Sequence, residues 1–161
     1  MSVQVELSRI FIREMTEMQI IELTELEGSR SFPIVIGLPE AFAIERRLKG
    51  IEIPRPQTHD LLGSVISTLG GKLIRIEIND LDAGTFYALL VVECEGGEVE
   101  IDSRPSDAIA LGVAHDVPIF VAEHVIEEAA AEHAGVTPAD EGFDSPDELD
   151  EDDLESEEGW S

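Results

Sequence analysis

Two Arg-Pro pairs constrain this chain most strongly, because each is followed by polar residues that include an Asp and then by an apolar run with helical spacing. The first segment reads IPRPQTHDLLGSVIS over Ile53–Ser67, and the second reads IDSRPSDAIALGVAHDVP over Ile101–Pro118. Proline is tolerated in the first turn of a helix, where Ser, Thr and Asp satisfy N–H groups that lack intrahelical partners. Each segment therefore predicts a helix start. The helix dipole and the neighbouring arginine also make each one a candidate anion-binding site.

Alternation of apolar and polar residues predicts strands before, between and after these helices. The expected strands are Val3–Arg13 with a bulge near Ser8, Met18–Leu26, Phe32–Ile36, Lys72–Asn79, Thr85–Cys94, Glu98–Asp102 and Pro118–Val121. The expected helices are Pro39–Lys49, His59–Leu69 with a clean apolar stripe, a helix from the second Arg-Pro pair to about Ala114, and Ala122–Ala134. This order predicts an α+β fold in which helices cover a mixed, mostly antiparallel sheet.

Particular residues refine this expectation. Pro33 favours an edge strand or a strand start, because proline cannot donate to a sheet. The most apolar run, Thr85–Cys94, predicts a central strand, and its single cysteine predicts a buried structural thiol. Turns are expected at 27–30, before the third strand, and at 80–84, where Gly84 can adopt positive φ.

Charge divides the chain into a domain and a tail. The net charge is −26, and twelve of the acidic residues lie between Thr137 and Ser161, where no Lys or Arg occurs. We therefore expect one compact domain over residues 1–134 and a disordered acidic tail over 135–161. So negative a chain repels phosphate backbones and favours cations or basic partners, although a small local basic site remains compatible with it.

No signal peptide or membrane span is expected, because the N-terminus has no basic stretch followed by a continuous apolar run. This pattern predicts a cytoplasmic protein. Within the helix expected over Pro39–Lys49, Glu40 in the first turn complements the helix dipole in the simplest interpretation. The neighbouring Arg46, Arg47 and Lys49 form the only cluster of basic residues. Together with Glu45, they are expected to lie largely on the solvent-facing side of the helix. They are either a solvated helix face or a phosphate-facing patch.

The residues around the two helix starts could carry phosphodiester hydrolysis. That reaction needs stabilisation of charge on the phosphoryl oxygens, an activated water and often Mg²⁺. The candidate catalytic residues are His59, Asp60, Asp102 and Asp107. The candidate substrate-binding residues are Arg55, Thr58, Arg104 and Ser106. Asp60, Asp102 and Asp107 are also candidate ligands of Mg²⁺ or another divalent cation, because hard cations prefer oxygen ligands.

Each of these residues also has a simpler interpretation. An Asp in the first turn of a helix is usually a cap, an Arg beside an Asp is usually an ion pair, and a single His is usually structural. Other familiar sites are missing from the sequence, which contains no Gly-rich phosphate loop of the Walker or Rossmann type, no Cys-x-x-Cys and no His-Glu-x-x-His. Both the chemical and the structural interpretations stay open at this point.

Four segments together resemble the bifunctional nuclease domain family: PRPQTHDLL, FYALLV, IDSRPSDAIAL and VPIFV, in this order over Pro54–Val121. The resemblance covers about Val3 to Ala130, and Glu40 also matches a family position. It implies a compact α+β fold, a homo-oligomer, and nuclease activity on DNA and RNA like that of bacterial single-domain and plant members. The chain differs from the family pattern where Ala114, His115 and Asp116 follow the second helix, since a basic residue is often found there.

Two functions from different classes follow. The first is a nuclease, with nucleic acid as substrate, whose site lies between the two helix starts. The alternative is a non-enzymatic regulatory or small-anion-binding domain, with the acidic tail engaging a basic protein partner. Clustering of Arg46, Arg47, Lys49, Arg55 and Arg104 on one face would favour phosphate binding. Two solvent-open carboxylates close enough to share a cation would favour metal assistance, whereas carboxylates held by arginines would indicate ion pairs.

Overall fold

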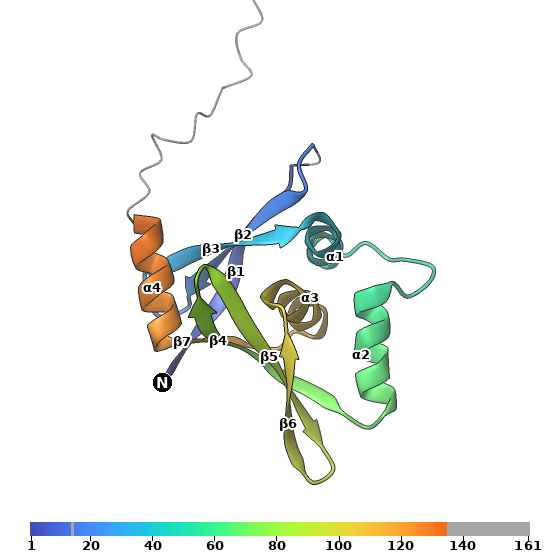
Figure 1. Cartoon of the computed structure of the whole chain (residues 1–161). Helices are drawn as coiled ribbons and strands as arrows, with labels where there is room; N and C mark the ends of the chain where they lie inside the picture. Colours follow the sequence, from blue (N-terminus) through green and yellow to red (C-terminus); the bar gives the residue numbers. More distant parts are fainter. Residues whose placement is uncertain (14, 135–161) are drawn as a thin grey trace, which may run out of the picture.

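The computed structural model describes residues 1–13 and 15–134, which form one seven-stranded sheet and four helices (Figure 1). The strands are β1 (Ser2–Phe11), β2 (Met18–Glu25), β3 (Ser31–Gly37), β4 (Lys72–Asp82), β5 (Thr85–Cys94), β6 (Gly97–Ser103) and β7 (Ile119–Ala122). The helices are α1 (Leu38–Leu48), α2 (Thr58–Thr68), α3 (Pro105–His115) and α4 (Glu123–Ala134). The order of elements and the α+β class agree with the sequence prediction.

The sheet runs in the order β3-β2-β1-β7-β4-β5-β6. Two three-stranded meanders, β1–β2–β3 and β4–β5–β6, are joined by the short strand β7, which pairs antiparallel with β1 and parallel with β4. Every other pairing is antiparallel, so the prediction of a mixed, mostly antiparallel sheet is confirmed. Pro33 lies in β3 at one edge of the sheet, as its missing N–H predicts.

Local irregularities also match the sequence. The register of β1 against β2 shifts between Leu7 and Arg9, which is the bulge expected near Ser8. The β4–β5 hairpin closes through Ala83 and Gly84, both with positive φ, which matches the right-handed twist of the two strands. Strand β5 is interior, because β4 and β6 flank it on both sides.

The helices form two groups around one continuous core. Helix α1 packs on α3, and α3 packs on β4 and β5, whereas α4 lies across β3, β4 and β7 (Figure 1). The core takes its largest fully buried side chains from both meanders and from α1, α3 and α4, among them Phe32, Ile44, Ile76, Ile109 and Ile126. Packing of α1 on α3 matters for function because it brings two helix N-termini from distant parts of the chain together.

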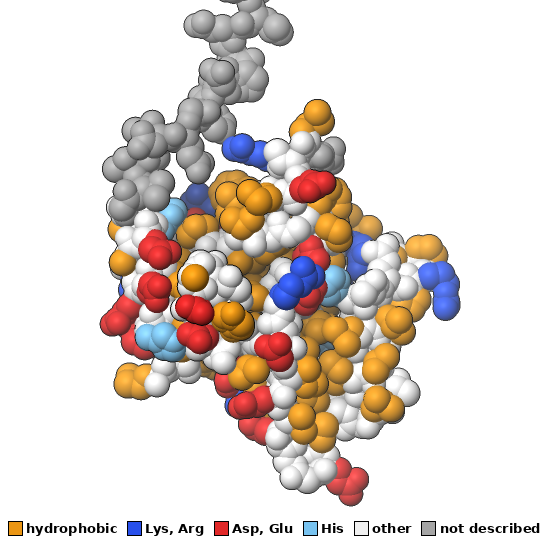
Figure 2. Space-filling model, viewed as in Figure 1, with side chains coloured by type: hydrophobic (Ala, Val, Ile, Leu, Met, Phe, Trp, Pro, Cys, Tyr) orange, Lys and Arg blue, Asp and Glu red, His pale blue; other side chains and the backbone are white. Residues whose placement is uncertain are grey.

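Helix α2 is much more exposed than its apolar stripe suggests. Gly63 is its only buried residue, while Leu61, Leu62 and Val65 are exposed and Leu69 is 83% exposed. Figure 2 shows hydrophobic side chains gathered over α2 and the neighbouring β6. The helix lies against α3 at Gly63, where an added Cβ would come within 2.6 Å of the His115 ring. Helix α2 is therefore held by limited packing against α3 and β4, in which Gly63 meets His115 and Ile66 packs on the core, and by polar contacts at its N-terminus described below.

Three further expectations have mixed outcomes. Cys94 is only partly buried, because it is the last residue of β5. No helix between residues 1 and 134 has the length and apolar character needed to cross a bilayer. The expected acidic tail, residues 135–161, lies outside the described residues.

Candidate active site

An open groove of about 770 Å³ lies where α1, α2 and the β6–α3 junction meet. Its polar lining comprises Glu40, Arg46, Gln57, Thr58, His59, Asp102, Ser103, Arg104 and Asp107. Its apolar lining comprises Pro39, Ala43, Leu62, Ile66, Leu90 and Ile101. The groove therefore has both a charged portion with acid–base groups and an aliphatic wall.

The two Arg-Pro segments meet in this groove: α3 begins at Pro105, and α2 begins at Thr58, two residues after Pro56. Gln57 is the N-cap of α2 and Arg104 is the N-cap of α3, and neither side chain caps its helix in the usual way. Pro105 occupies the first turn of α3, as its fixed φ favours. The polar side chains at the start of α3 are therefore available for contacts with other elements.

A hydrogen-bonded chain of four side chains crosses the groove. His59 Nε2 lies 2.8 Å from Asp107 Oδ1, and Arg104 Nε donates to Asp107 Oδ2 over 2.9 Å. Arg104 Nη2 donates to Glu40 Oε1 over 2.7 Å. These hydrogen bonds join α2, α3 and α1. His59 lies 48 residues from Asp107 in the sequence, and Glu40 lies 64 residues from Arg104.

The protonation of this chain follows from its contacts. Burial would raise the pKa of Asp107, but hydrogen bonds from Arg104 and His59 outweigh it and hold the pKa below its ordinary value. Hydrogen bonds to Asp107 and Glu40 raise the pKa of Arg104, so this guanidinium stays charged. An ionised carboxylate only accepts hydrogen bonds, so His59 Nε2 carries the proton that points at Asp107. In a neutral ring, Nδ1 is then left with a lone pair.

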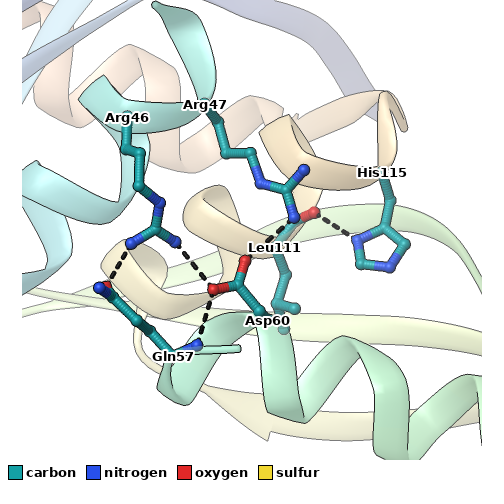
Figure 3. Close-up of polar contacts among 6 residues, drawn as sticks. All are labelled: Arg46, Arg47, Gln57, Asp60, Leu111 and His115. Atoms are coloured by element: carbon teal, nitrogen blue, oxygen red, sulfur yellow. Dashed lines mark hydrogen bonds and ion pairs between the residues drawn. The ribbon is translucent and has the colours of Figure 1, made fainter. Parts of the chain in front are cut away.

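Asp60 belongs to a separate cluster at the start of α2, drawn in Figure 3. Its carboxylate accepts hydrogen bonds from Arg46 over 2.9 Å, from Arg47 over 3.0 Å and from the Gln57 N–H over 2.9 Å. Arg46 also donates to the Gln57 side chain. Burial would raise the pKa of Asp60, but these hydrogen bonds and the charges of both arginines lower it. The cluster therefore fastens α2 to α1.

The other predicted site residues divide between the groove and the surface. Thr58 and Asp102 are exposed and line the groove, and Asp102 has no hydrogen-bond or ion-pair partner within residues 1–13 and 15–134. Ser106 is buried in the first turn of α3 and does not line the groove. Arg55 is exposed in the segment between α1 and α2 and also lies outside the groove lining.

The structure does not bring the three predicted metal ligands together. Asp60 is held by two arginines, Asp107 is held by Arg104 and His59, and Asp102 stands alone. Across the part of the chain that the structure describes, no three His, Cys, Asp or Glu side chains are grouped closely enough to hold a metal ion. This donor set does not fit the predicted divalent cation.

The basic residues gather only in part. Arg46 and Arg104 line the groove, but each is engaged by carboxylates. Arg46 was expected largely outside, yet its side chain is only 12% exposed because it reaches across to Asp60. Lys49 pairs with Glu45 over 2.8 Å on the surface of α1. Of the five basic residues whose clustering on one face would favour phosphate binding, only Arg46 and Arg104 therefore line the groove.

Two groove residues could not be assigned from the sequence. Glu40 was interpreted through the helix dipole, yet its carboxylate contacts Arg104. Gln57 bridges Arg46 and Asp60, and no pattern in the sequence singles it out. The close spacing of Glu40 and Gly37 was the available signal for the first, since it places a small residue one helical turn before the carboxylate.

Comparison with known proteins places this domain in a family. The model of the bifunctional nuclease domain matches residues 21–134, a range that includes every residue of the four-membered chain. Two Mycobacterium tuberculosis relatives, Uncharacterized protein Rv1829 and Uncharacterized protein MT1877, are 38% identical over 126 residues, which cover 78% of this chain and 75% of each relative. Bifunctional nuclease 1 of Oryza sativa subsp. indica is 25% identical over 111 residues, which cover 67% of this chain and 34% of the rice protein.

The fold and the matched range define a domain that carries a groove between helix N-termini. This chain belongs to the bifunctional nuclease domain family. The family assignment confirms the resemblance drawn from the four sequence segments. It extends over most of the sheet and all four helices.

Proposed function

We propose that this chain hydrolyses phosphodiester bonds of DNA and RNA in the groove between α1, α2 and α3. The observation that carries the proposal is the contact of His59 with Asp107, which also holds Arg104. It places an oriented imidazole and a guanidinium side by side in an open groove of a bifunctional nuclease domain. General acid–base groups and an arginine for phosphate are two requirements of this reaction.

The residues would divide the work as follows. Asp107 orients the His59 ring, so that Nδ1 can accept a proton from the attacking water. As the new phosphorus–oxygen bond forms, the bond to the leaving oxygen breaks, and the protonated imidazole or solvent returns a proton to that oxygen. Arg104 would donate to a phosphoryl oxygen through Nη1, which has no partner within the described residues.

Charge in the groove sets a condition on this reaction. Three carboxylates, those of Glu40, Asp102 and Asp107, face two guanidinium groups, those of Arg46 and Arg104. With a neutral His59 the lining is therefore negative by one charge, and a phosphate would add to it. A divalent cation bound together with the substrate would relieve this repulsion, and we retain that prediction as a part of the proposal to be tested.

The same charge favours a second candidate, a non-enzymatic regulatory domain. Arg46 and Arg104 are both already paired with carboxylates, so neither offers a whole uncompensated charge to an anion. In that case a basic protein partner would engage the acidic tail. Because the tail lies outside the described residues, this candidate depends on the sequence of residues 135–161 alone.

Assembly into a homo-oligomer is also a proposal. The exposed apolar stripe of α2, formed by Leu61, Leu62, Val65 and Leu69, supports it because such a stripe on a helix usually packs on another surface. Analytical ultracentrifugation of the full chain tests the idea. A monomer at every concentration examined would contradict it.

Cleavage of fluorescent single-stranded DNA and RNA tests the two candidate functions. The full chain, His59→Ala and Asp107→Asn are assayed with Mg²⁺, Mn²⁺ or EDTA, beside a variant that ends at Ala134. A nuclease predicts cleavage that both substitutions remove and that removal of the tail leaves intact. Cleavage unaffected by either substitution would point to another site or to a contaminant, and no cleavage under any condition would favour the regulatory domain.

A further inference from the structure

Glu40 is a buried carboxylate with one side-chain partner. Its exposed fraction is 9%, and glutamate is rarely buried unless its charge is paired. Among the described residues, the hydrogen bond it accepts comes from Arg104 Nη2, which lies in a segment 64 residues away. The carboxylate therefore sits in a site that the fold has prepared on α1 and aims at the start of α3.

Gly37 makes room for this carboxylate. An added Cβ at Gly37 would lie 2.3 Å from Glu40 Oε2, a distance that side-chain carbons do not tolerate. The backbone at Gly37 has φ −76° and ψ 160°, which any residue adopts, so its conformation gives no reason for glycine. Glycine is therefore needed at this position for the room that it leaves beside the Glu40 carboxylate. Gly37 and Glu40 thus form a matched pair in which the small residue seats the acid.

Arg104 is the side chain that benefits from this seat. It is 67% exposed, and an exposed arginine with a single ion pair ordinarily gains little and samples several rotamers. Here Asp107 holds Nε and Glu40 holds Nη2, and the two carboxylates belong to different helices. One carboxylate is enough to neutralise a guanidinium. The second one fixes the direction of the guanidinium plane.

We propose that Glu40 is a positioning residue that acts through Arg104, and that the absence of a side chain at Gly37 leaves room for the Glu40 carboxylate. Fixed at two corners by Glu40 and Asp107, the guanidinium presents its remaining edge, including Nη1, to a phosphoryl oxygen. The ordering of Arg104 is then complete before substrate binds. The catalytic consequence depends on the proposed nuclease function, whereas the seating of Arg104 does not.

A purely structural role would be different. In that case the Glu40–Arg104 contact would only tie α1 to α3, and its loss would lower stability without changing how Arg104 is held in the variant that still folds. The two roles are separated by a signal from Arg104 itself. The NMR resonance of the Arg104 Nε–H, assigned with Arg104→Lys, reports whether the guanidinium is held or mobile.

The test compares Glu40→Ala, Gly37→Ala and the double variant in the full chain, with Glu45→Gln as control. Glu45 lies on the same helix and pairs with Lys49 away from the groove, so the control removes an equal charge. We expect Glu40→Ala and Gly37→Ala each to move the Arg104 signal toward that of a mobile arginine. We also expect each to lower kcat/KM for cleavage about tenfold, as for the loss of one charge-assisted hydrogen bond.

The double variant gives the sharpest outcome. In the double variant, the Glu40 carboxylate that the methyl group introduced by Gly37→Ala would contact is absent. The Arg104 signal and kcat/KM of the double variant should therefore equal those of Glu40→Ala alone. Glu40→Gln, which keeps an acceptor of equal length, should retain part of the signal and of the activity.

An Arg104 signal unchanged in Glu40→Ala and Gly37→Ala would overturn the proposal, whatever happens to stability. Additive effects of Gly37→Ala and Glu40→Ala on the Arg104 signal and on kcat/KM would contradict the proposal that Gly37 acts through Glu40. If the wild-type chain cleaves nothing, the NMR signal still decides the seating of Arg104, and the nuclease function alone has failed.

Discussion

Asp60→Ala should release α2 from the rest of the domain. Helix α2 buries only Gly63, and its N-terminus is fastened by the hydrogen bonds that Asp60 accepts from Arg46, Arg47 and the Gln57 N–H. Because His59 is the residue before Asp60, the same change should loosen the imidazole. The prediction therefore connects the stability of one helix with the geometry of the groove.

The size of the effect can be worked from the three contacts. The bond to the helix N-terminal N–H is worth about 1 kcal/mol. The bond from Arg46, whose side chain is 12% exposed, is charge-assisted and worth about 1.5–3 kcal/mol. The bond from the exposed Arg47 is discounted to less than about 1 kcal/mol because solvent screens it. We expect Asp60→Ala to lower the free energy of unfolding by about 3 kcal/mol.

The pH dependence has a definite sign. Since the pKa of Asp60 is lowered in the folded chain, its contribution is complete above the unfolded pKa of about 3.9 and is lost as pH falls through the folded pKa. The difference in unfolding free energy between wild type and variant should hold from pH 7 to about 5. It should narrow progressively as the pH falls below about 4.

Urea denaturation across this pH range measures the difference, and amide hydrogen exchange shows whether α2 opens first. Glu52→Ala is the matched control, because Glu52 is an exposed acid in the same α1–α2 segment. A difference below about 0.5 kcal/mol, or the same difference at pH 3 and pH 7, would refute the reasoning, since surface substitutions commonly stay within that range.

Three further predictions concern other contacts. Gly71→Ala should lower the free energy of unfolding by about 1–3 kcal/mol in urea denaturation, because the added Cβ would lie 3.1 Å from the rigid Ile66 carbonyl oxygen; an unchanged midpoint would contradict this. Arg104→Ala should cost about 1–3 kcal/mol, since it leaves the Glu40 carboxylate buried without its partner, and a thermal midpoint equal to wild type would count against it. Glu98→Gln, which removes an exposed partner of Arg75 on β4, should leave the urea midpoint unchanged because solvent screens the pair, and a lower midpoint would contradict this.

Most of the fold follows from local sequence signals. The order of all eleven elements, the bulge near Ser8 and the edge position of Pro33 come from residue periodicity and from the missing proline N–H. The place of β7 between β1 and β4 does not, because strand neighbours far apart in sequence are chosen by tertiary packing. The exposure of α2 likewise depends on what the remaining elements leave uncovered.

The candidate site shows the same division. Both helix starts could be found, because Arg55-Pro56 and Arg104-Pro105 carry strong local signals. The partner of each aspartate could not be predicted from the sequence, because Asp60 and Asp107 are the same residue type and occupy nearly the same position in their helices. The pairing of Asp60 with Arg46 and of Asp107 with His59 is decided by the tertiary arrangement of α1, α2 and α3. Long-range partners of this kind have no signature in a single sequence.

Chemical rescue of His59→Ala by imidazole tests the central claim most directly. In the proposed reaction, the His59 ring is oriented by Asp107 and accepts a proton from the attacking water during phosphodiester cleavage in this groove. We predict that the variant loses at least about a hundredfold in cleavage rate, which is the usual contribution of a general acid or base. Added imidazole should restore part of the rate, and it should restore none in Asp107→Asn. A contaminating nuclease cannot respond in this way. Cleavage by His59→Ala at the wild-type rate, with or without imidazole, would contradict the account.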